Sequence, residues 1–185
     1  MKINTIFALA LLTSSTAFAE KKEHREHDAH EHGHAQLSVV LEESNLQMML
    51  ESPAMNIFGF EHKPKKEEQK KIVALAVKDL ENFEPLLLIA DSAKCNLVKV
   101  DVHQPFEVKS ESKHEHEENA EESTHTDVDV EVSFTCQNAA KLTQIDLAPL
   151  FKRFPGFEEL DTQKIINGKQ SAEELSKEMS ILKLN

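Results

Sequence analysis

The chain has 185 residues and a formal net charge of −12 at pH 7. This length fits one domain or two small lobes. The acidic balance excludes a nucleic-acid-binding surface, which needs clustered lysine and arginine, and leaves cations or a basic partner surface as the ligands to expect. Ten histidines, set among glutamates, are the most unusual part of the composition.

Residues 1–19 have the pattern of a cleavable secretory signal peptide. Lys2 gives a basic start, residues 6–12 are apolar, and Ala17-Phe18-Ala19 is a small-residue cleavage site. The apolar run is too short to span a membrane, and no later segment has about 18 consecutive apolar residues. We therefore predict an exported protein that is not inserted in a membrane.

Two polar segments carry most of the histidines. Residues 20–33 have almost no apolar side chain, so we expect a flexible arm ahead of a single domain at 34–185. Residues 107–126 are polar and rich in glutamate, which predicts a disordered insertion within that domain. The histidines that we interpret as weak, mobile metal collectors are His24, His27, His30, His114 and His116.

Alternation of apolar and polar residues with period two predicts several strands. They cover residues 35–41 and 46–50, which form a hairpin, and residues 94–102 and 128–136. The apolar residues of the C-terminal tail fit two or three short strands, with a short helix over 171–179 as the alternative.

One long helix is predicted after the hairpin. Pro64 suits its first position, and Ile72, Ala76, Leu80 and Phe83 would line a buried face over about five turns. The predicted fold class is therefore α+β, with mainly antiparallel strands and one long helix.

An internal repeat is a further hypothesis. When Gly59-Phe60-Glu61 is laid on Gly156-Phe157-Glu158, the strands before each segment align without a gap. The fold would then have two pseudo-symmetric halves based on β-hairpins. The alternative is that two hairpins align through their periodicity alone.

Cys95 and Cys136 are the only cysteines of the chain. In an exported protein, an even pair favours a disulfide over thiolate zinc ligands. For the loop that this bond would close, the chain-entropy model gives a stabilisation of the folded state of about 4 kcal/mol.

Imidazoles crowded among carboxylates indicate metal binding, with zinc favoured and nickel or copper(II) as alternatives that geometry would decide. Two histidines two residues apart at a strand start would project from one face and share an ion. A third lies near the helix N-terminus, where capping or packing is its alternative role, and two more flank the polar insertion. These candidate ligands are His32, His34, His62, His103 and His125.

Residues His30 to His34 also match the letters H-E-x-x-H of zinc proteases. That chemistry needs a helix and a shaped cleft, whereas this segment contains Gly33 and leads into a predicted strand. We therefore predict that the protein is not an enzyme.

Several short segments together carry a family resemblance. They are His32-Gly33-His34-Ala35, Glu51-Ser52-Pro53-Ala54-Met55-Asn56-Ile57, Gly59-Phe60-Glu61-His62 and Phe134-Thr135-Cys136. With the Cys95 strand and the histidine-rich insertion, the chain resembles the ZrgA-like periplasmic zinc-uptake proteins of Gram-negative bacteria.

The resemblance implies a periplasmic protein that captures Zn(II) and works with an inner-membrane ABC transporter. His32, His34 and His62 belong to the matching segments, so they rank first among the candidate ligands. A periplasmic metal buffer or chaperone, for zinc, nickel or copper(II) and not tied to a transporter, is the alternative function.

Overall fold

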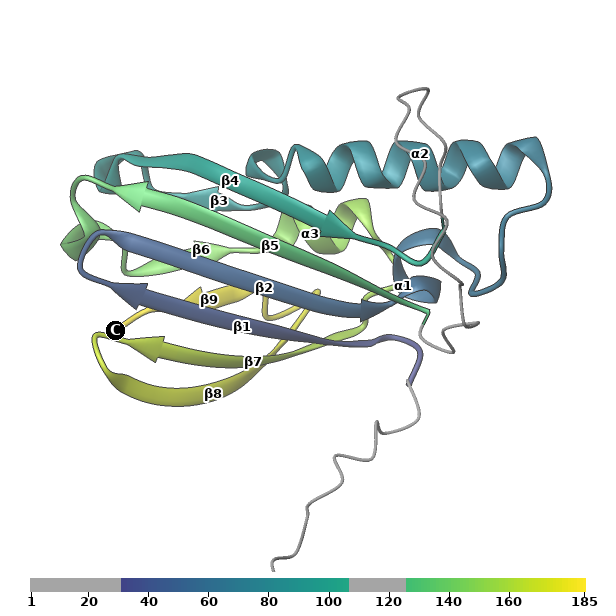
Figure 1. Cartoon of the computed structure of the whole chain (residues 1–185). Coiled ribbons are helices and arrows are strands. Elements are labelled where there is room, and N and C mark those ends of the chain that lie inside the picture. The colour runs from purple at the N-terminus through teal and green to yellow at the C-terminus, as the bar shows by residue number, and fades with distance from the viewer. Residues whose placement is uncertain (1–30, 107–125) are drawn as a thin grey trace, which may run out of the picture.

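The computed structural model of the chain describes residues 31–106 and 126–185. Its largest element is a six-stranded sheet with the strand order β4-β5-β2-β1-β7-β8 (Figure 1). Neighbouring strands are antiparallel except for β1 and β7, which are parallel. The strands are β1 (His34–Glu42), β2 (Asn45–Pro53), β4 (Cys95–His103), β5 (Asp127–Cys136), β7 (Glu159–Ile166) and β8 (Lys169–Ser176). The prediction of a mainly β fold is confirmed, whereas the prediction of one long helix is not, because the described residues form three α-helices.

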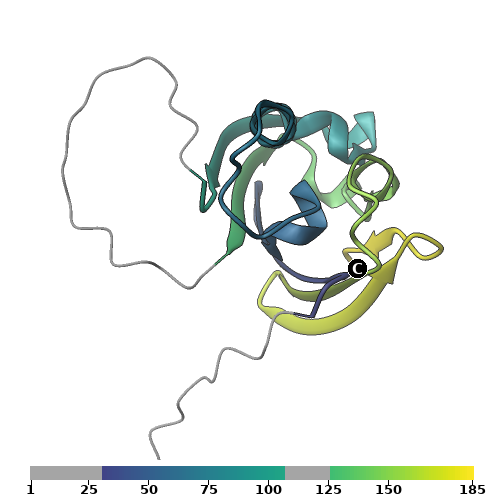
Figure 2. The same cartoon turned by 90° about the vertical axis from the view of Figure 1, so that its right-hand side faces the viewer.

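A second, three-stranded sheet has the order β3-β6-β9. Its strands are β3 (Leu88–Ile89), β6 (Gln144–Asp146) and β9 (Ile181–Lys183). The α-helices are α1 (Ala54–Phe58), α2 (Glu67–Glu81) and α3 (Ala148–Arg153), and the 3-10 helices are η1 (Glu84–Leu86), η2 (Asp91–Ala93) and η3 (Ala139–Lys141). In the end view, the large sheet curls around α1, and α2 lies beside β4 (Figure 2). Within residues 31–106 and 126–185, no helix is long and apolar enough to cross a membrane.

The large sheet has one buried and one solvent-facing side. In β1 the buried side chains are Ala35, Leu37, Val39 and Leu41, each at most 4% exposed. Strand β5 alternates in the same way, with Val128, Val130, Val132 and Phe134 inside. This is the pattern of a sheet that packs on a core with one face and meets water with the other.

Helix α2 differs from its prediction in its start and in its buried face. It begins at Glu67, three residues after Pro64, and its 15 residues make about four turns. The Gln69 side chain accepts hydrogen bonds from the main-chain N–H groups of Lys65 and Lys66, which fixes this start.

The face of α2 that packs on the domain consists of Val73, Ala76 and Leu80, followed by Phe83 just beyond the helix. The prediction that Ile72 belongs to the core is wrong, because its side chain is 45% exposed. Adjacent residues lie about 100° apart around a helix, and here Val73 points into the core, which turns Ile72 toward solvent.

The C-terminal tail forms strands. Residues 169–176 are β8, which pairs with β7, so the alternative of a helix over 171–179 is wrong. The internal repeat is not confirmed, because β5 and β6 belong to different sheets and form no second hairpin.

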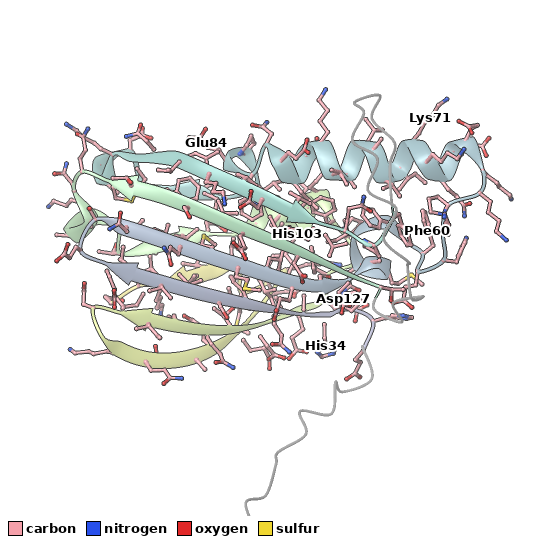
Figure 3. The ribbon with its side chains drawn as sticks, in the orientation of Figure 1. His34, Phe60, Lys71, Glu84, His103 and Asp127 are labelled. Atoms are coloured by element: carbon pink, nitrogen blue, oxygen red, sulfur yellow. A yellow bond between two sulfur atoms is a disulfide. The ribbon has the colours of Figure 1, made fainter. Side chains whose placement is uncertain are left out.

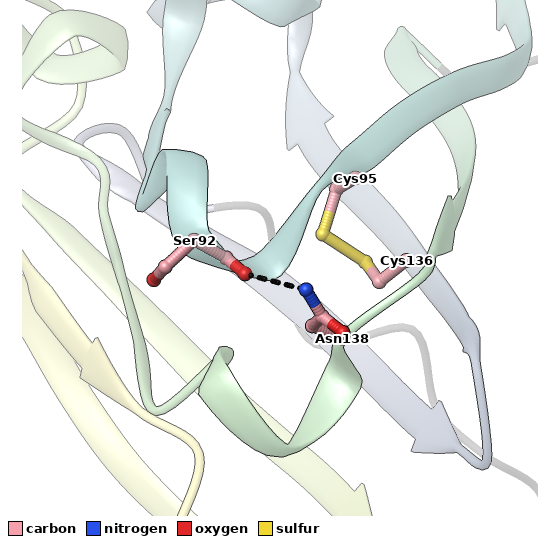
Figure 4. Close-up of a disulfide and its surroundings, with 4 residues drawn as sticks. All are labelled: Ser92, Cys95, Cys136 and Asn138. Atoms are coloured by element: carbon pink, nitrogen blue, oxygen red, sulfur yellow. Dashed lines mark hydrogen bonds between the residues drawn. A yellow bond between two sulfur atoms is a disulfide. The ribbon is translucent and has the colours of Figure 1, made fainter.

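The predicted disulfide is present. Cys95 and Cys136 are bonded and lie opposite each other on β4 and β5. Next to them, the Asn138 side chain donates a hydrogen bond of 3.1 Å to the carbonyl of Ser92 (Figure 4). Cys136 also donates its N–H to the carbonyl of Ser44 in the β1–β2 turn, so the disulfide lies at the opposite end of the sheet from His34.

The predicted signal peptide at 1–19 lies outside the described residues, as do residues 20–30 of the predicted arm and 107–125 of the predicted insertion.

Candidate metal centre

The chain enters β1 through a turn at residues 31–33 that is tied to two other parts of the molecule. Gly33 has φ +94°, a left-handed conformation that favours glycine. Its N–H donates to Asn56 Oδ1 at 2.8 Å, and its carbonyl accepts from the N–H groups of Glu158 and Glu159 at 2.8 and 3.1 Å. Gly33, which we assigned to the end of the arm, is therefore hydrogen-bonded to α1 and to the start of β7.

Asn56 is the buried link in this arrangement. Its Nδ2 group donates to the carbonyl of His34 at 2.8 Å and to Ser52 Oγ at 3.2 Å. Gly156 packs directly on the main chain of Asn56, because a Cβ atom at Gly156 would lie 2.4 Å from the Asn56 carbonyl oxygen. Two of the segments that carry the family resemblance, residues 32–35 and 51–57, thus meet at Asn56.

His34 lies beside a group of carboxylates. Its Nδ1 atom is 3.6 Å from Glu159 Oε2. The parallel register of β1 and β7 sets His34 opposite Glu159, and the register of β7 and β8 sets Asp161 opposite Glu174. Oxygens of Glu159, Asp161 and Glu174 lie within 4.8 Å of one another, a spacing that can hold a metal ion.

The electrostatics of this group favour a bound cation. A hydrogen bond with Glu174 raises the pKa of Glu159, and desolvation and repulsion from Glu174 raise it further. The neighbouring His34 lowers it in part. A divalent cation bound here would remove the repulsion between these carboxylates.

The acidic surface continues across the sheet from this point. In the antiparallel registers, Glu51 lies opposite Asp129, which lies opposite His103. Burial raises the pKa of Asp129, repulsion from Asp127 adds to it, and His103 lowers it. His34, Asp127 and His103 lie at the same end of the sheet (Figure 3).

His32 does not share the strand face that we predicted. Strand β1 begins at His34, so His32 lies in the preceding turn, where its Nε2 atom is 3.2 Å from Glu61 Oε1. The two imidazoles are paired with different carboxylates. The prediction that His32 and His34 lie on one strand face is therefore wrong, because the left-handed Gly33 separates them and β1 begins only at His34.

His62 lies ahead of α2, as predicted from the sequence. Its ring centroid is 5.2 Å from that of Phe60, and its Nε2 atom is 2.9 Å from Gln69 Nε2. Gln69 is also the residue that caps the helix start. These contacts fit the packing role that we named as the alternative for His62.

The remaining predicted ligands divide into two sets. His103 is exposed on the outer face of β4, in the row with Asp129. The predicted ligand His125 and the predicted collectors His24, His27, His30, His114 and His116 lie outside the described residues.

Sequence reasoning missed the carboxylates of Glu159, Asp161 and Glu174. The alternation of Glu159, Asp161 and Gln163 was a possible signal for a strand with one polar face. No signal in the sequence indicated the parallel pairing of β7 with β1. This long-range contact brings the polar face of β7 beside His34.

The family model of the ZrgA family zinc uptake proteins matches residues 29–184. The chain belongs to the ZrgA family. The match covers the turn at residues 31–33, α1 and the starts of β1 and β7, where the candidate centre lies. Membership in the ZrgA family gives the protein a role in zinc uptake, with zinc as its ligand. A search of curated proteins gave no match.

Proposed function

We propose that this protein captures Zn(II) in the periplasm and hands it to an inner-membrane ABC transporter. The zinc uptake role of the family supports the cargo, and the signal-peptide pattern of residues 1–19 supports export. The single observation that carries the proposal is the position of the His34 imidazole beside Glu159, at the edge of the Glu159, Asp161 and Glu174 group.

The proposed zinc site consists of His34, Glu159, Asp161 and Glu174. Zinc in proteins takes about four nitrogen and oxygen ligands, and one imidazole with two or three carboxylates supplies such a set. Three neighbouring strands contribute these side chains, so the donors stand on a stiff platform. The His34 side chain is 38% exposed, so an ion could both reach the site from solvent and leave it again.

A second donor pair lies on the other side of Gly33. His32 and Glu61 form it, with His62 adjacent to Glu61 in sequence. We propose that this pair is a second, weaker zinc-binding site, and that His103 forms another with Asp129. His125 and the histidines of the two polar segments remain proposed collectors.

The proposed role is binding rather than catalysis. In the H-E-x-x-H match, the described residues 31–34 form a turn and the first residue of β1, whereas a zinc protease carries this motif on a helix. The donor set favours zinc over copper(I), which prefers sulfur ligands, while nickel and copper(II) would compete at imidazole and carboxylate.

A growth experiment separates uptake from buffering. A strain with the gene deleted is complemented with the parent or with His34→Ala and grown in chelated medium at graded zinc. Uptake predicts that only the parent restores growth at low zinc. Unchanged growth after deletion, with other zinc transporters also removed, would favour the buffer instead.

A binding experiment tests the site itself. Zinc titrations of His34→Ala and Glu159→Gln are compared with the parent and with Glu84→Gln, which removes a carboxylate from η1, away from the proposed ligands. The proposal predicts weaker binding in the first two variants and parent-like binding in the third. Equal affinities in all four proteins would refute the proposed ligands.

A further inference from the structure

The donors of the proposed zinc site are held by a residue that is not itself a ligand. We propose that Asn56 is the positioning residue of this site, and that it fixes His34 before zinc arrives. The inference rests on the proposed function, because it requires His34 to bind the ion. Asn56 is 3% exposed and lies in the short helix α1.

The hydrogen bonds of Asn56 enclose the main chain at His34. Its Oδ1 atom accepts from the N–H of Gly33, and its Nδ2 group donates to the carbonyl of His34, each at 2.8 Å. One bond lies before the Cα atom of His34 and the other after it. A rotation of the main chain at His34 would break one of them, so the direction of the Cα–Cβ bond that carries the imidazole is set.

Gly33, which Asn56 holds, is also hydrogen-bonded to the segment that carries Glu159. The Gly33 carbonyl accepts hydrogen bonds from the N–H groups of Glu158 and Glu159, at the point where β7 begins. Asn56 therefore fixes His34 relative to the strand that carries Glu159. Donors that are already oriented lose less conformational entropy when an ion binds, which raises affinity.

Burial of the amide supports a role in geometry. A buried amide costs free energy unless its hydrogen bonds are made, and an apolar residue of similar size would fill the volume without that cost. The amide of Asn56 makes bonds to Gly33, His34 and Ser52. Two of these three partners belong to the segment that presents the histidines.

The test compares two variants of Asn56 with two controls in the full-length protein. Asn56→Ala removes all three bonds, and Asn56→Asp keeps the shape but turns an oxygen toward the His34 carbonyl. Ser52→Ala removes one neighbouring bond and leaves Gly33 and His34 held. Asn138→Ala removes a side-chain bond to a carbonyl at the disulfide end.

Zinc affinity is expected to fall about 10- to 100-fold in both Asn56 variants and to stay near the parent value in both controls. Cobalt(II) supplies a readout that loss of stability alone would not change. Its visible absorption reports ligand geometry, so the spectrum should change in the folded Asn56 variants and remain as in the parent in Ser52→Ala.

Two results would overturn the inference, and only the second is also a failure of the proposed function. If His34→Ala abolishes binding while both Asn56 variants keep the parent affinity and cobalt spectrum, Asn56 positions nothing. If His34→Ala has no effect on zinc affinity, the proposed function fails and the inference falls with it.

If both Asn56 variants fail to fold, the inference is tested by hydrogen exchange of the Gly33 amide in the parent protein. Protection of the Gly33 amide without zinc is expected, and an amide that becomes protected only after zinc is added overturns the inference.

Discussion

A Cβ atom on Gly156 would lie 2.4 Å from the main-chain oxygen of Asn56. This contact closes the space between the loop ahead of β7 and helix α1. Real Cβ atoms do not approach a main-chain oxygen so closely, so any side chain at Gly156 must push the two segments apart.

The first prediction concerns Gly156→Ala. Since a main-chain atom cannot move aside cheaply, we expect a loss of about 3 kcal/mol in the free energy of unfolding, together with weaker zinc binding. Gly59→Ala is the matched control, because Gly59 has φ +80° and no atom near its missing Cβ. It should cost only about 1 kcal/mol. Urea denaturation measures both, and an equal or smaller loss in Gly156→Ala would contradict the packing argument.

A second prediction concerns Glu159 in the metal-free protein. The hydrogen bond with Glu174 raises the pKa of Glu159, so the folded chain holds this proton more tightly than the unfolded chain does. Stability is therefore lost as pH rises from the ordinary carboxyl pKa through the higher folded value. Glu159→Gln should raise the thermal unfolding midpoint at pH 7 and leave it nearly unchanged at pH 4, both measured in chelator. A lower midpoint at pH 7 would argue against repulsion at this site.

A third prediction is that zinc affinity falls between pH 7 and about 5.5. An imidazole must be unprotonated to bind zinc, and the ordinary histidine pKa is about 6.5. Calorimetric titration at several pH values measures this fall. His34→Ala should have a shallower dependence than the parent. Affinity that does not change over this range would exclude ligation by histidine.

The fourth prediction separates stability from binding. Replacing Cys95 and Cys136 together by alanine removes a cross-link between residues 41 apart in sequence and should cost about 4 kcal/mol of stability. The disulfide lies at the other end of the sheet from His34, so zinc affinity should stay at the parent value. Loss of zinc binding in a folded double variant would show that the two ends are coupled.

The strands and the disulfide were predictable because their signals are local or compositional. The alternation in β1, β2 and β5 identifies strands directly, and a pair of cysteines in an exported chain indicates a bond. Ile72 was misjudged because two adjacent apolar residues in α2 satisfy the same periodicity.

The site was harder to predict because it depends on strand pairing. His34 was identified from residue type, but Glu159, Asp161 and Glu174 reach it only through the parallel pairing of β1 with β7 and the register of β8. No short-range pattern in the sequence encodes that contact. The left-handed Gly33 likewise turns His32 toward Glu61, which strand periodicity could not predict.

The central claim is that the folded domain, at His34 and Glu159, is the tight zinc site. The most direct measurement is a calorimetric zinc titration of three proteins: the parent, the double variant His34→Ala/Glu159→Gln, and a variant with alanine at His24, His27, His30, His114, His116 and His125. The account predicts that the last keeps one tight site and that the double variant loses it. A double variant that binds as tightly as the parent, with loss of tight binding in the six-histidine variant, would contradict the account.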